Sequence, residues 1–179
     1  MKKRGTYVVR LSGLADGLHE FDFDLDQRFF EQFEQSEITQ GRVKVHVELE
    51  KKAGTMTLRF ALSGDVDVVC DRCLTPFRAP FETSQRMFLK PGDEPGEVND
   101  EVVVIARDAH EVDVAQWLYE FIVLALPVQR IHPDGADGQE GCDPVMLQHL
   151  RAHQAGSAQE EKTSDPRWDA LKDIKGKSK

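Results

Sequence analysis

Hydrophobic and polar positions alternate along much of the first half of the chain. Apolar side chains occupy every second position in residues 41–50, and the same pattern recurs in residues 55–62 and 65–70. Successive side chains of a β-strand point to opposite faces, so this alternation predicts strands with one buried face. Strand-like composition also predicts strands at residues 6–13, 76–89 and 101–105.

The connections between these strands are short. Residues 51–54 and the pair Ser63-Gly64 have the composition of tight turns, and the acidic residues 91–100 that of a solvated loop. Pro76 and Pro80 place the first half of their strand at a sheet edge or bulge. These short connections predict an antiparallel sheet.

Two segments follow a helical period instead. Asp26 can cap a short helix that carries Phe29, Phe30 and Phe33 on one face. In residues 113–127 a second apolar stripe has helical spacing, with Asp113 and Gln116 as a capping box and Pro127 as the stop. The stripe consists of Val114, Trp117, Leu118, Phe121, Ile122 and Ala125.

The predicted fold class is therefore α+β: a twisted antiparallel sheet or partly closed barrel packed by two helices. We expect this core to span residues 1–127. Residues 128–179 should form a flexible loop and a C-terminal helical extension. Within it, Asp143-Pro144 and Asp165-Pro166 each resemble a helix start, and residues 151–164 a flexible linker.

Composition narrows the class of protein. With 40% hydrophobic and 31% charged residues among 179, the chain can form one core with polar extensions. It has no apolar run of membrane-spanning length and no apolar segment typical of a signal peptide, so we expect a cytoplasmic protein without a membrane partner. The net charge of −9 disfavours sequence-independent nucleic-acid binding and favours a basic protein partner.

The residues with the clearest chemistry are three cysteines. Cys70 and Cys73 have C-x-x-C spacing, and His132 with Cys142 could complete the four ligands of a structural zinc site. Reduced structural thiols are the alternative, because the second pair has no standard ligand spacing. A thiol oxidoreductase is disfavoured, because no helix follows the pair to lower a thiol pKa.

Catalytic motifs of hydrolases, P-loop proteins and zinc proteases are absent from the sequence, so we expect a protein that is not an enzyme and has no small-molecule substrate. Near the C-terminus, Trp168 could dock onto a partner or pack back onto its own sheet.

The order of three motifs resembles the YceD family. These are Cys70-Asp71-Arg72-Cys73-Leu74, a helix ending in Leu124-Ala125-Leu126-Pro127, and Asp165-Pro166-Arg167-Trp168. The resemblance implies a role in accumulation of the large-subunit (23S) ribosomal RNA. It implies this cellular process and no chemical reaction. Many family members have a C-x-x-C segment after the Leu-Pro helix, where this chain has only His132 and Cys142.

From these observations we expect a non-catalytic factor that supports 23S rRNA accumulation by binding a large-subunit ribosomal protein or the rRNA itself. Its contact surfaces would be the turn at residues 70–74 and the C-terminal segment 165–168. The alternative from another class is a zinc-stabilised adaptor that acts outside ribosome assembly.

Overall fold

The computed structural model describes residues 7–34, 36–134 and 141–157. The chain divides into two compact units, residues 1–132 and 133–179. The predicted second helix start at Asp165, and with it the candidate residues 165–168, lies outside the described residues.

The first unit is built on a six-stranded sheet in the order β2-β3-β4-β5-β7-β6. Its strands are β2 (Gly17–Leu25), β3 (Gln40–Lys52), β4 (Thr55–Val69), β5 (Pro76–Gly92), β6 (Gly96–Asn99) and β7 (Val102–Ala106). Neighbours are antiparallel except β5 and β7, which run parallel. The α+β class is confirmed, and the sheet is mixed and does not close into a barrel.

One face of this sheet forms the core. The alternating apolar residues of β3 are almost fully buried, as are those of β4, which explains the period-two pattern: Val43, Val45, Val47, Leu49, Leu58, Phe60 and Leu62. The other face is polar and solvated, as is common for sheets with mostly antiparallel pairing. Burying only one face leaves a broad charged surface.

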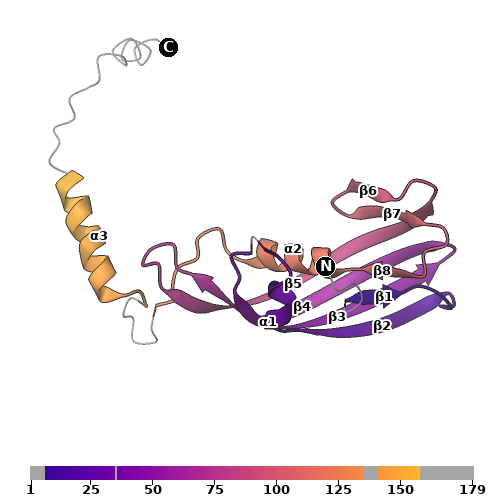
Figure 1. Ribbon diagram of the computed structural model, residues 1–179, viewed down its shortest axis with the longest axis horizontal. Helices are drawn as coiled ribbons and strands as arrows, with labels where there is room; N and C mark the ends of the chain where they lie inside the picture. The colour runs from indigo at the N-terminus through magenta and orange to yellow at the C-terminus, as the bar shows by residue number, and fades with distance from the viewer. Residues whose placement is uncertain (1–6, 35, 135–140, 158–179) are drawn as a thin grey trace, which may run out of the picture. The chain divides into compact units, whose positions relative to one another are not determined.

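The buried face is covered by helices and a small second sheet. Helix α1 (Gln27–Phe30) packs against β3, and α2 (Ala115–Ala125) packs against β5 and lies along the sheet (Figure 1). Strands β1 (Val8–Arg10) and β8 (Glu111–Asp113) pair with each other and form the small second sheet. Phe33 and Tyr119 stack with ring centroids 4.1 Å apart and join the segment after α1 to α2.

The helix ends follow the predictions in part. Asp26 caps α1 by accepting a hydrogen bond from the Arg28 backbone N–H, as expected. The predicted capping box of α2 is wrong, because Gln116 donates to Glu120 and Asp113 accepts from the Ala115 backbone N–H. The helix ends at residue 125, before Pro127, as predicted.

Two predictions about the strands and their connections need correction. No turn forms at Ser63-Gly64: β4 runs through it, and Gly64 lies between Val43 and Phe81 in the ladder. A Cβ on Gly64 would overlap the backbone of Arg42 and Val43. This glycine therefore allows β3 and β4 to approach each other closely, and it does not form a turn. The predicted loop at residues 91–100 contains β6, which is exposed throughout.

Strand β2 was not predicted at all. Its Phe21, Phe23 and Leu25 alternate with acidic residues in the way that marks a half-buried strand. The first half of β5 is paired on one side only, because β7 pairs with residues 88–92. This confirms the edge position inferred from Pro76 and Pro80.

The described part of the second unit contains α3 (Pro144–Ser157). Asp143 caps it as predicted, because its side chain accepts hydrogen bonds from the backbone N–H groups of Val145 and Met146. The linker predicted from residue 151 is wrong up to residue 157, where the chain is still helical. Among the described residues no helix is long and apolar enough to cross a membrane.

The close approach at Gly64 gives the first testable prediction. Gly64→Ala should lower the free energy of unfolding by about 1–3 kcal/mol or more, because the added methyl group has backbone atoms and not a movable side chain in its way. Gly96→Ala is the matched control, since a Cβ there meets nothing within 4 Å. Equal urea midpoints for the two variants would contradict the account.

Candidate metal centre

The turn between β4 and β5 is closed by backbone hydrogen bonds. The Leu74 N–H donates to the Cys70 carbonyl over 2.9 Å, and the Cys70 N–H donates to the Thr75 carbonyl over 3.0 Å. Both cysteine side chains are directed into the protein, with exposed fractions of 0% for Cys70 and 2% for Cys73. The C-x-x-C spacing thus places two thiols at the end of a long hairpin.

Leu74 ends this turn in a conformation that leucine rarely adopts. Its φ is +62°, in the left-handed region, and its side chain is 67% exposed. The left-handed conformation costs a non-glycine residue roughly 1–2 kcal/mol. An apolar side chain that is both strained and solvated contributes nothing evident to folding.

A segment far along the chain is held against the turn. The Asp71 N–H donates to the Arg130 carbonyl over 2.8 Å, and the Arg130 N–H donates to the Asp71 carboxylate over 2.7 Å. The Arg130 guanidinium forms ion pairs with Glu37 and with Asp71. This reciprocal pairing, which the sequence did not reveal, fixes the chain two residues before His132.

His132 is thereby brought to the cysteine pair. Its Nδ1 lies 3.4 Å from the Sγ of Cys73, and its ring packs at a tilt on Phe77 with centroids 4.6 Å apart. The Cys73 sulfur also lies 3.0 Å from the Thr75 hydroxyl. The structure therefore places the predicted ligands Cys70, Cys73 and His132 together within the first unit.

The electrostatics of the turn favour a thiolate at Cys70. Burial raises the pKa of this thiol, but hydrogen bonds from the backbones of Cys73, Arg72 and His132 and from the Cys73 side chain outweigh it and lower the pKa to about 7. Donors aimed at a sulfur stabilise its anionic form. A thiolate is the form of cysteine that binds metals.

Cys142, the fourth predicted ligand, is a buried residue of the second unit. Thiolate and imidazole are the donors of structural zinc sites. The first unit by itself brings three of the four predicted ligands together, and zinc as their occupant remains a proposal.

Thiol redox chemistry would need a different local structure. A lowered thiol pKa is shared by metal ligands and by reactive cysteines, so the pKa alone does not separate them. The pair is followed by β5 and not by a helix whose N-terminus would face the first thiol. Both sulfurs are buried, which limits their access to a second thiol.

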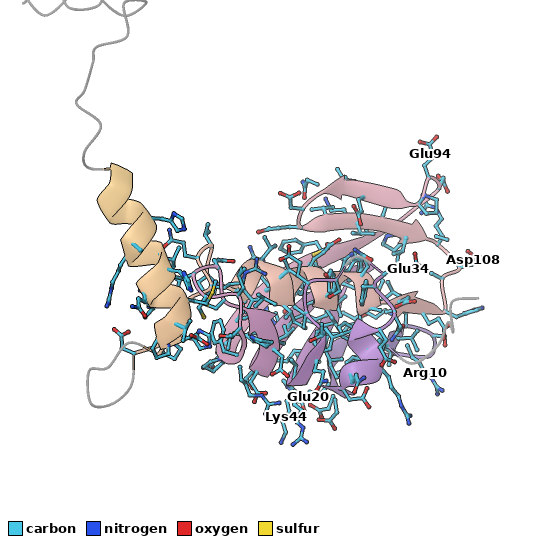
Figure 2. The ribbon with its side chains drawn as sticks, turned by 60° about the vertical axis from the view of Figure 1, so that its left-hand side comes forward. Arg10, Glu20, Glu34, Lys44, Glu94 and Asp108 are labelled. Atoms are coloured by element: carbon cyan, nitrogen blue, oxygen red, sulfur yellow. The ribbon has the colours of Figure 1, made fainter. Side chains whose placement is uncertain are left out.

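A second surface, not predicted from the sequence, lies on the solvated face of the sheet. Two adjoining hollows of about 600 and 450 Å³ cross β3, β4 and β5, above the small residues Ala61, Ser63 and Ser84. Glu20 and Lys44 project on this side (Figure 2). Small residues in register on neighbouring strands were the sequence signal that could have revealed it.

Charge pairs surround these hollows. His46 Nδ1 lies 2.8 Å from the Asp22 carboxylate, and this hydrogen bond raises the pKa of His46 despite the opposing effect of burial. Glu20, His46 and Glu48 form a second group that could hold a metal ion. It is exposed and rich in oxygen donors, unlike the buried sulfur cluster.

A comparison with protein-family models identifies the family to which the chain belongs. The family model described as large ribosomal RNA subunit accumulation protein YceD matches residues 58–175, about two thirds of the chain. The chain belongs to the YceD family. The comparisons with curated proteins and with solved structures gave no significant match.

The YceD match covers both the cysteine turn and the C-terminal motif. Residues 70–74 lie near its beginning and residues 165–168 near its end. His132 and Cys142 fall between them. The family description connects the chain to accumulation of large-subunit ribosomal RNA and assigns no role to an individual residue.

The pairing of Asp71 with Arg130 yields a second prediction. Asp71→Ala removes the acceptor of the Arg130 N–H, so the free energy of unfolding should fall by about 0.5–1.5 kcal/mol. Hydrogen exchange at the Arg130 amide should accelerate more than exchange elsewhere. Asp108→Ala, which removes an exposed carboxylate (Figure 2), is the control and should change neither quantity. An unchanged Arg130 exchange rate in Asp71→Ala would refute this pairing in solution.

Proposed function

We propose that this YceD protein is a non-catalytic factor that supports accumulation of 23S ribosomal RNA by binding a basic large-subunit ribosomal protein. The observation that carries the proposal is the family match, which spans residues 58–175. The rRNA itself is the other partner that the family description allows. The turn at residues 70–74 is the contact surface we assign to the first unit.

The turn has the features of a contact surface. Leu74 holds an exposed apolar side chain at a strained position, while the residues beneath it are buried and hydrogen-bonded. Strained backbone at a fixed position often accompanies function. Exposed apolar residues of the adjoining segment, Leu124 and Val128, add to the apolar surface of this unit.

The charge of the chain supports a protein partner over RNA. The formal net charge is −9, and the edge strand β2 places Glu20, Asp22 and Asp24 on one face at alternating positions. RNA binding draws much of its affinity from phosphates neutralised by Lys and Arg. A lysine- and arginine-rich ribosomal protein complements such a surface better.

The experiment is recovery of partners from cell lysate with the tagged full chain. Enrichment of a large-subunit ribosomal protein that persists after ribonuclease treatment supports the proposal. Enrichment of 23S rRNA that survives removal of protein would replace the protein partner by RNA. Recovery of neither would favour the adaptor outside ribosome assembly and overturn the proposed function.

Leu74 provides a prediction that separates binding from folding. Leu74→Asn replaces the exposed apolar side chain by a residue that tolerates the left-handed region, so stability should stay equal or rise by up to about 1 kcal/mol. Recovery of the ribosomal partner should fall at least about tenfold, which corresponds to about 1.4 kcal/mol.

Val98→Asn is the matched control. Val98 is 64% exposed, nearly as much as Leu74, but it lies outside the turn. Its strand, β6, is the edge of the sheet opposite to β2. It should leave recovery unchanged. Equal recovery with Leu74→Asn and with the unaltered chain would remove the turn as the contact surface, and thermal unfolding of both variants shows whether each is folded.

A further inference from the structure

We infer that the outer edge of β2 binds an extended segment of a basic protein, which adds a strand to the six-stranded sheet. The segment carries lysine or arginine at every second position and apolar residues between them. This site deepens the proposed function and rests on it for the class of the partner. It is a second contact surface of the first unit, separate from the turn at residues 70–74.

Strand β2 has one open backbone side. It stands at the end of the sheet order, and within the described part of the chain it pairs with β3 alone, without interruption from Gly17 to Leu25. On the side away from β3, its backbone groups form no backbone hydrogen bond with any described residue. In Figure 1, β2 borders the sheet at the bottom of the view. Such an edge is a template on which another extended chain can pair.

The other open edges of this sheet are less suited to strand addition. Strand β6 has four residues, and its register with β7 shifts between Glu97 and Asn99. The open half of β5 contains Pro76 and Pro80, which have no N–H to donate. Short length, bulges and proline are the features by which proteins block sheet edges. Strand β2 has nine residues, no proline and a continuous register, so it lacks all three.

The solvated side of β2 is acidic. Glu20, Asp22 and Asp24 lie on this side at alternating positions, and all three are exposed. Asp22 is bonded to His46, whereas among the described residues Glu20 and Asp24 form no ion pair with lysine or arginine. In a strand paired with β2, the side chains opposite these carboxylates lie about 4.5–5.5 Å away between Cβ atoms. Lysine or arginine at those positions complements the acidic side.

The core side of β2 is apolar and incompletely covered. Phe21 and Phe23 pack against the core but stay partly exposed, whereas Leu25 at the end of the strand is buried. Apolar residues of an added strand would cover these two rings and remove their surface from water. The two sides of β2 together therefore select a strand in which basic and apolar residues alternate.

A second copy of the chain fits this edge poorly. Pairing of β2 with β2 of another copy would bring Glu20, Asp22 and Asp24 of both strands onto one face. Like charges directly opposite each other destabilise a strand pair. The charge that disfavours self-association favours a basic segment, so the occupant is a different, basic chain.

The first test uses a synthetic probe on the full chain. The probe is a labelled peptide about as long as β2, with alternating lysine and valine and capped ends, and its binding is followed by fluorescence anisotropy. Two further peptides carry N-methyl groups, one on every lysine amide and the other on every valine amide. Alternate amides of a strand point to opposite edges, so one methylated peptide should bind at least about tenfold more weakly and the other about as well as the unmodified probe. Equal affinity of all three peptides, or no binding of any, would overturn the inference.

A double variant tests the acidic side of β2. Glu20→Gln combined with Asp24→Asn should weaken binding of the unmodified peptide about tenfold, because two lysines lose the carboxylates opposite them. The matched control combines Glu94→Gln with Glu97→Gln, which changes the net charge equally at two exposed positions in and before β6 (Figure 2). The control should bind as the unaltered chain does. Equal weakening in both double variants would reduce the effect to net charge and contradict strand addition at β2.

Hydrogen exchange locates the contact. Without the peptide, alternate amides of residues 18–24 should exchange fast, and with the peptide the same amides should slow, because the N–H groups on the open side gain acceptors. The amides that face β3 should change little. Slowed exchange at β6, or none within β2, would refute the assignment.

The peptide experiments need no ribosomal protein, so they can fail separately from the proposed function. If the peptide binds β2 but lysate yields no ribosomal protein, the proposed function fails and the strand site stands. If the unaltered chain and the Glu20→Gln/Asp24→Asn variant recover equal amounts of ribosomal protein, the function stands and the strand site is overturned. Sedimentation that shows a dimer, strengthened in the same variant, would make a second copy the occupant and overturn the basic partner at this edge.

Discussion

The backbone pairing of Asp71 with Arg130 is the interaction on which the candidate site depends. It joins the tip of the β4–β5 hairpin to the segment that follows α2, across 59 positions of sequence. It holds the segment that carries His132 beside the cysteine turn, where the imidazole ring also packs on Phe77. The sheet supplies a rigid base for this pairing, because β4 is bonded to β3 and β5 along nearly its whole length.

Sequence periodicity predicted those strands and helices that bury one face and expose the other. The period-two pattern of β3 and the helical stripe of α2 follow directly from burial. Gly64 was misread, because a glycine needed for close approach of strands has the same sequence signal as a glycine in a turn. The parallel pairing of β5 with β7 depends on how the chain crosses the sheet edge, which no local pattern encodes.

The sequence pointed to the residues of the cysteine turn and not to its architecture. C-x-x-C spacing singled out Cys70 and Cys73, and the position of His132 in the glycine-rich loop made it a candidate that the structure places beside them. The strained Leu74 and the Asp71 pairing were not predictable, because leucine has no preference for positive φ and a hydrogen bond to a distant backbone leaves no motif. The hollows on the solvated sheet face were missed, because small residues such as Ala61 and Ser84 come together only through the register of β4 and β5.

The central claim is that the turn at residues 70–74 is the surface through which this YceD protein binds a basic large-subunit ribosomal protein. Hydrogen exchange of the full chain, measured with and without the ribosomal protein recovered from lysate, tests it most directly. The account predicts that the partner slows exchange at the amides of the turn. Slowed exchange confined to other parts of the chain, with the turn unchanged, would contradict it.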